Sequence, residues 1–492
     1  MIKDLRFVTP ESEGLSSKHI LKFIQLMERR KVNLHSFMIV RRGNIIAEGY
    51  VKPFDVNSKK RFYSTSKTIV SLAIGKLIGA GKIALNDTLL SYFPEYKHEG
   101  MEKWLKETTI EDALKMAVAV RTNTYGEKEY PNWVSTFFTH PYRSQCTKPS
   151  GTVFSYNTSA TFMLCALIER VTGKTFLEYL RPEFDKIGVD KDIWCVQSPD
   201  GYAWGGSGVI ATMRDFAKIG ELLLYKGNIG GEQLVPREYM EKATSKQISN
   251  VMNGHYSELK SCGYGYQIWI NEKGYSMYGL GGQFVYCFPN EEFMFVCNGD
   301  IPGEAEDYVY DCVRGVLYDN LQNMALDADK GNYLLLQEKL ANLSFIKGVG
   351  EKHSVFEKEI NGKTYRLKEN DMGWKWLRFD FTGERGTLTY ENARGVKQIP
   401  FGCGECIRAN FPETHYYDKT VFSPSNRAFD SLFIAEWTEE RKILLRAYII
   451  DDNFANLHMT FGFKGKEVGC AFYARAEWCL EDYQGFAGGV QE

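Results

Sequence analysis

The sequence predicts an α+β protein in two parts, and two observations carry that prediction. Hairpin-like strands flank a helix-rich middle within residues 1–325, which is typical of an antiparallel sheet flanked by helices, with a helical subdomain inserted. From residue 351 onward the helical signals give way to short strand-like runs broken by Gly and Asn. We therefore expect a first domain over 1–325, an amphipathic connector over 326–350 and a β-rich C-terminal domain over 351–492.

The first part begins with a helix and a hairpin. Ser16 or Ser17 is suited to cap a helix whose apolar residues recur at helical spacing, and residues 36–50 form strands around a turn at 41–44. Residues 121–150 show no clear period and predict a long loop. Later elements are a helix from 161 to 171, a helix from 213 to 225, strands at 263–270, 282–288 and 293–297, and a helix at 308–321.

The second part predicts a sandwich or a barrel, because its helical signals are weak and its short strand-like runs are broken by Gly and Asn. It carries no catalytic motif, and its role stays open. The expected strands cover 363–367, 376–381, 386–390, 431–437, 442–449, 457–463 and 470–476.

The composition argues against a nucleic-acid-binding or membrane protein and favours a cytoplasmic one. A formal net charge of -2 leaves no basic surface for nucleic acid or an anionic membrane. The N-terminal residues 1–6 lack a signal-peptide pattern, and no run approaches the roughly 18 apolar residues of a membrane span. The 11 cysteines form no framework, which favours a cytoplasmic protein. Cys403 and Cys406 form a lone CxxC, for which Cys470 and Cys479 are distant further ligands, so neither a metal nor another cofactor is expected.

Ser64 and Lys67 are the candidates for chemistry. Three residues apart on a helix, a hydroxyl and an amine share one face, and the amine can take the hydroxyl proton while the helix N-terminus offers N–H groups to an oxyanion. The same spacing recurs at 257–260 and 344–347, so spacing alone is weak. Ser64 differs because a nearly continuous apolar helix over 69–78 follows it, which predicts a buried, rigid support. The alternative is that Ser64 is only a helix N-cap.

Two further motifs follow in order, Tyr156-Asn157-Thr158 and Tyr278-Gly279-Leu280-Gly281-Gly282-Gln283. With Ser64-Thr65-Ser66-Lys67, they make residues 10–325 resemble the serine β-lactamase, penicillin-binding protein and class C-like esterase family. The segments 204–208 and 214–218 also resemble stretches of this family that line the cleft and form a helix. The resemblance implies a β-lactamase-like fold with Ser64 as the acylated nucleophile and Lys67 as its activating amine. Tyr156 would be a general base whose phenol pKa the Lys67 charge lowers.

The second and third motifs depart from the family pattern. The family has asparagine where Thr158 stands, and the neighbouring Asn157 is out of register with that position. The third motif lacks the family's Lys or His and instead resembles the branch that includes aminohexanoate-oligomer hydrolases. There the N–H of Leu280, or of Gly279, would join that of Ser64 as an oxyanion hole, with Gly281 letting substrate lie against the backbone.

These residues together predict a serine hydrolase that cleaves an ester or amide through an acyl-enzyme. The expected partner is a small ester or amide substrate, with no nucleic acid and no membrane; whether the chain forms a homo-oligomer stays open. Two alternatives remain: a D-alanyl carboxypeptidase or β-lactamase, and a catalytically silent binding protein that uses the same cleft.

Overall fold

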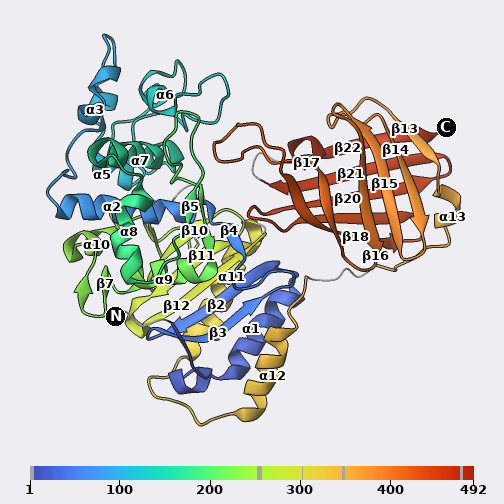
Figure 1. The fold of residues 1–492 in the computed structure, drawn as a ribbon, viewed down its shortest axis with the longest axis horizontal. Coiled ribbons are helices and arrows are strands. Elements are labelled where there is room, and N and C mark those ends of the chain that lie inside the picture. Colours follow the sequence, from blue (N-terminus) through green and yellow to red (C-terminus); the bar gives the residue numbers. More distant parts are fainter. Residues whose placement is uncertain (1–4, 252–256, 302, 346–349, 477–479) are drawn as a thin grey trace. The chain divides into compact units, whose positions relative to one another are not determined.

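The computed structural model describes residues 5–251, 257–301, 303–345, 350–476 and 480–492 (Figure 1). The chain divides into two compact units. Unit 1 comprises Met1–Ser344 together with Lys419–Phe422, and unit 2 comprises Phe345–Asp418 and Ser423–Glu492. None of the helices within these ranges is long and apolar enough to cross a bilayer.

Unit 1 is built on a seven-stranded sheet in the order β1-β3-β2-β12-β11-β10-β9 (Figure 1). All neighbours pair antiparallel except β1 and β3. Every residue of β2 is buried, so both faces of the sheet are covered there. The strands are β1 (Arg6–Phe7), β2 (Leu34–Arg41), β3 (Asn44–Tyr50), β9 (Trp269–Ile270), β10 (Tyr275–Gly279), β11 (Gln283–Phe288) and β12 (Phe293–Gly299).

Helices from the start, the middle and the end of unit 1 cover this sheet. The amphipathic α9 (Met213–Leu224) packs on β2, β11 and β12, and α12 (Lys330–Ala341) packs on β3 and on α1 (Ser17–Arg29). Ser16 caps α1 by accepting a hydrogen bond from the Lys18 N–H at 3.3 Å, as its residue type predicts. A fourth helix, α11 (Gly303–Cys312), continues as a π-helical turn, Val313–Leu317, and a 3-10 turn, Tyr318–Asn320.

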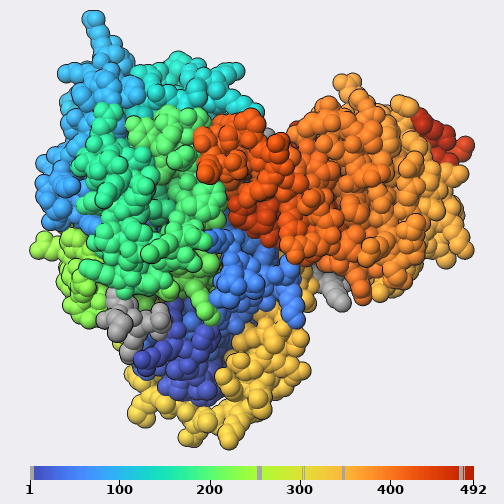
Figure 2. All heavy atoms as spheres, viewed as in Figure 1, coloured from blue at the N-terminus to red at the C-terminus, as the bar shows by residue number. Residues whose placement is uncertain are grey.

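A helical region lies between β3 and β9 in the chain, light blue through green in Figure 2. At its centre is α2 (Ser66–Gly79), which packs against α7, α8 and α10 and is buried over most of its length, because its sequence is apolar on every side. The other helices are α3 (Leu89–Tyr92), α4 (Lys103–Lys106), α5 (Ile110–Leu114), α6 (Trp133–Thr139), α7 (Thr158–Thr172), α8 (Phe176–Lys186) and α10 (Arg237–Ala243). Two small sheets join β4 (Lys59–Arg61), β5 (Trp194–Cys195) and β6 (Val209–Thr212), and β7 (Asn228–Ile229) and β8 (Glu232–Gln233).

Unit 2 is a β-barrel, one of the two architectures expected for this region. Its ten strands run β16-β15-β14-β13-β22-β21-β20-β19-β18-β17, and an extra pairing of β16 with β18 closes the sheet. A short helix, α13 (Glu357–Ile360), precedes the strands. These are β13 (Thr364–Leu367), β14 (Trp376–Thr382), β15 (Arg385–Asn392), β16 (Gly395–Cys403), β17 (Ile407–Thr414), β18 (Ala428–Glu439), β19 (Lys442–Ile449), β20 (Ala455–Lys464), β21 (Glu467–Ala476) and β22 (Gly485–Gln491).

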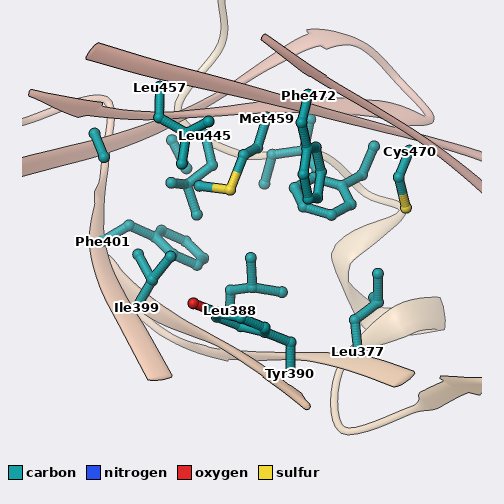
Figure 3. Close-up of a cluster of buried hydrophobic side chains, with 14 of the residues drawn as sticks. Leu377, Leu388, Tyr390, Ile399, Phe401, Leu445, Leu457, Met459, Cys470 and Phe472 are labelled. Atoms are coloured by element: carbon teal, nitrogen blue, oxygen red, sulfur yellow. The ribbon is translucent and has the colours of Figure 1, made fainter. Parts of the chain in front are cut away.

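Side chains fill the interior of the barrel. Figure 3 shows side chains from opposite walls meeting in the interior, with Leu388 and Tyr390 of β15 on one wall and Met459 of β20 and Phe472 of β21 on the other; all four are buried. Trp374 stacks on Tyr390 with ring centroids 3.7 Å apart. Large apolar and aromatic side chains of this kind make the inside of unit 2 a packed hydrophobic core.

Several elements differ from the sequence prediction. The strand expected at 263–270 is reduced to β9, because Gly263 (φ 127°) and Gln267 (φ 60°) turn the chain before it. The loop expected at 121–150 contains the helix α6. Strands β16, β17 and β22 were not expected; β22 is glycine-rich and β17 contains Pro412, so neither has strong strand propensity.

Candidate active site

Ser64 lies in a tight 3-10 turn, Tyr63–Thr65, that leads directly into α2. This differs slightly from the expected first turn of an α-helix. Tyr63 holds a φ of 48°, a conformation that costs a non-glycine residue energy, and it is nearly fully buried. The buried helix behind it keeps the turn in place, so the Ser64 hydroxyl is presented at a defined, half-buried position.

Lys67 reaches back from the first turn of α2 to that hydroxyl. Its Nζ lies 2.9 Å from Ser64 Oγ and also donates a hydrogen bond to the carbonyl of Gly206. The side chain is 1% exposed, so bulk water does not compete for the amine. A buried amine in contact with the hydroxyl is placed to exchange a proton with it.

Tyr156 completes the group, and its phenol pKa shifts in the direction opposite to the predicted one. Its ring centroid lies 5.0 Å from Lys67 Nζ. Burial raises the pKa of the phenol well above its usual value, and a hydrogen bond with the Ser64 side chain lowers it only in part. The net shift is therefore opposite in direction to the expected lowering, because burial outweighs the hydrogen bond with Ser64. A raised pKa keeps the Tyr156 hydroxyl protonated at neutral pH.

An aromatic wall borders Tyr156. Trp269 of β9 stacks on it at a centroid distance of 5.6 Å, and Tyr278 of β10 packs on Trp269 at 5.5 Å. Trp269 and Tyr278 are half-buried, so part of each ring stays open to solvent. Neither was predicted as a site residue, although aromatic residues cluster in this stretch of the sequence.

The glycine motif spans the end of β10 and the turn to β11. A Cβ on Gly279 would lie 2.5 Å from the carbonyl oxygen of Phe62, so this strand end packs against the backbone just before Ser64. Gly281 holds a φ of 77° in the turn, and its carbonyl accepts from the Ile301 N–H at 2.9 Å. Leu280 is 42% exposed between them. Its N–H makes no hydrogen bond within the described part of the chain.

The two residues after Tyr156 have different surroundings. Asn157 is the N-cap of α7, where its side chain accepts from the Ser159 N–H at 2.9 Å. Thr158 is 7% exposed, and its N–H donates to the side-chain oxygen of Asn123 at 2.7 Å. Asn123 was not predicted, because it lies in a stretch without periodicity and reaches α7 only through the tertiary fold.

The repeated serine–lysine spacing at 257–260 has a structural role. Ser257 Oγ accepts from the Lys260 N–H at 3.2 Å and donates to Asp307 at 2.7 Å. Lys260 forms an ion pair with the buried Glu306 at 2.8 Å. The other repeat, at 344–347, ends outside the described residues.

Comparisons with known proteins agree with this architecture. The family model "Beta-lactamase" matches residues 22–309, more than half of the chain. A curated relative, the 6-aminohexanoate-dimer hydrolase of Paenarthrobacter ureafaciens, is 24% identical over 318 residues, which cover 60% of this chain and 79% of the relative.

Two solved structures resemble the chain. A penicillin-binding protein homologue from Caulobacter crescentus has a TM-score of 0.50 at 15% identity, covering 64% of this chain and 100% of that one. The octameric penicillin-binding protein homologue from Pyrococcus abyssi has a TM-score of 0.48 at 15% identity, covering 96% of this chain and 99% of that one. The family match over residues 22–309 carries the conclusion: this chain belongs to the β-lactamase family.

Proposed function

We propose that the protein is a serine hydrolase that cleaves an ester or amide bond through an acyl-enzyme formed on Ser64. The observation that carries the proposal is the contact of 2.9 Å between Lys67 Nζ and Ser64 Oγ at the N-terminus of a buried helix. Family membership supports hydrolytic chemistry in general. The further contact between Tyr156 and the same hydroxyl supports acyl transfer, since it supplies a second proton-transfer group.

In the proposed reaction, the Lys67 amine in its neutral form takes the proton of Ser64 as Oγ attacks the substrate carbonyl. The N–H groups of Ser64 and Leu280 bind the oxyanion; removing one such donor typically costs about 3 kcal/mol. Tyr156 gives its proton to the leaving amine or alcohol and recovers a proton from the Lys67 ammonium. Water then attacks the acyl-enzyme by the same transfers in reverse, which releases the acid and restores Ser64.

We infer an acyclic ester or amide as substrate. The third motif lacks the Lys or His that the resemblance associates with β-lactam recognition, and the aromatic wall of Trp269 and Tyr278 offers a partly exposed apolar surface next to Tyr156. The name of the curated relative suggests the dimer of 6-aminohexanoate as the first substrate to test.

A fluorophosphonate probe followed by intact-mass measurement tests the proposal. We expect one adduct on the wild-type protein, located at Ser64 by peptide mapping, and none on Ser64→Ala. Ser257→Ala is the matched control, because it removes a serine with the same spacing to a lysine and should label like wild type. A folded wild-type protein that takes no label, or a Ser64→Ala variant that still labels, rejects the proposal.

A further inference from the structure

We propose that the carbonyl of Gly206 is a positioning group that holds Lys67 against Ser64. Gly206 and Thr158 form a matched pair in this role, because the Thr158 methyl fills the space that a side chain at residue 206 would need. This inference rests on the proposed function, since it concerns how the activating amine is kept in place. It assigns a role to a backbone group and to the threonine that stands where the family has an asparagine.

Lys67 has a long, flexible side chain, so its Nζ needs a second contact to stay beside the serine. The Gly206 carbonyl supplies one, because it accepts a hydrogen bond from Nζ while Nζ also contacts Ser64 Oγ. A carbonyl only accepts hydrogen bonds, so this contact does not occupy the amine lone pair that would take the proton of the hydroxyl.

The segment around Gly206 is fixed on both sides. Arg61, 1% exposed, donates from Nε to the Ser207 carbonyl at 2.8 Å and from Nη2 to Ser207 Oγ at 3.0 Å. The Val209 N–H donates to Ser66 Oγ at 3.2 Å, and the Phe62 N–H donates to the Val209 carbonyl at 3.0 Å. The carbonyl that contacts Lys67 is thus tied to the strand before the nucleophile and to the first turn of α2.

Thr158 explains why residue 206 is glycine. A Cβ at position 206 would lie 2.5 Å from the Thr158 Cγ2 methyl, and its next neighbour would be the Thr158 carbonyl oxygen at 3.4 Å. Thr158 cannot easily move away, because it begins α7, its N–H is bonded to Asn123 and its branched side chain has few rotamers. The methyl therefore occupies the space that any side chain at 206 needs.

The pair makes a second-site prediction. Gly206→Ala should displace the carbonyl from Lys67 and lower kcat on a nitrophenyl ester on the order of 100-fold, with KM little changed, because small misplacements of a catalytic group have effects of this size. Thr158→Ser removes only the methyl, and its own rate is the reference against which the double variant is compared. The double variant should recover most of the lost rate, since the nearest remaining contact is then an ordinary one.

Gly205→Ala is the matched control. Its Cβ would meet Val70, Cys165 and Phe176 at 2.5 to 2.7 Å, so Thr158→Ser should not restore any activity that it loses. Thermal melts establish that each variant is folded; if Gly206→Ala does not fold, the double variant still must fold and turn over. A folded Gly206→Ala enzyme with wild-type kcat, or a double variant as slow as Gly206→Ala or unfolded, overturns the inference. Failure of wild type to label at Ser64 would instead reject the proposed function.

Discussion

Replacing Lys67 by methionine removes the amine while keeping a side chain of similar length in the same buried space. Nζ contacts Ser64 Oγ at 2.9 Å and the Gly206 carbonyl, so the change deletes the proposed base and both hydrogen bonds. General acid–base catalysis by one group typically contributes about 10²- to 10⁴-fold, which corresponds to about 2.7–5.4 kcal/mol of barrier. We expect kcat/KM to fall by that range.

The effect on stability should be small by comparison. Leaving a buried hydrogen-bond acceptor unsatisfied costs about 1–3 kcal/mol, whereas removing a buried ionisable group relieves a desolvation penalty of several kcal/mol. The two effects oppose each other at a position that is 1% exposed. Lys67→Met should therefore unfold at a denaturant concentration equal to or above that of wild type.

The assay is hydrolysis of a nitrophenyl ester together with the rate of fluorophosphonate labelling, each measured on protein whose melting curve is known. Lys76→Met is the control, because Lys76 lies on the same helix but bonds the Tyr179 carbonyl and Glu183. It should keep the wild-type rate. A folded Lys67→Met enzyme within about tenfold of wild type would refute the assignment of Lys67 as the base.

Four further predictions concern the same unit. Tyr156→Phe should slow amide hydrolysis by about 10²-fold or more and nitrophenyl ester hydrolysis far less, because nitrophenolate leaves without a proton; equal losses would contradict the role of donor. Since burial raises the pKa of Tyr156, wild-type amide hydrolysis should not lose this proton donor until the pH exceeds about 10. Gly279→Ala should destabilise the fold by about 1–3 kcal/mol in urea melts and lower activity, because its Cβ would meet the Phe62 carbonyl at 2.5 Å; an unchanged melt would be inconsistent with that contact. Burial raises the pKa of Glu221 from 4.5 to about 7. The folded state therefore keeps this proton to higher pH than the unfolded chain, and the free energy of unfolding should fall by at most about 3 kcal/mol as the pH rises from 4.5 to about 7. Glu221→Gln should flatten this part of the plot of unfolding free energy against pH. A plot for the variant that runs parallel to that of wild type would exclude Glu221 as the cause.

Local sequence determined much of this protein. The serine, tyrosine and glycine motifs carried the resemblance to the β-lactamase family, and helical periodicity and turn residues, which act over a few positions, predicted the individual helices and strands. The loss of helical signals after 350 indicated the β-rich second part, although the domain boundaries at 325 and 350 stay predictions, as does the catalytic role of Ser64. Spacing also produced the false match at Ser257, which only its contacts with Asp307 and Lys260 explain.

The tertiary structure decided what depends on burial and on distant contacts. The pKa of Tyr156 is raised rather than lowered because the fold partly buries the phenol, and no local sequence pattern encodes burial. Gly206 and Asn123 contact the site through a backbone carbonyl and a loop side chain, each far in sequence from its partner. The sequence alone thus placed Ser64, Lys67 and Tyr156 in the order of the family's motifs, and the packing of α2, α7 and the segment around Gly206 set which of their atoms meet.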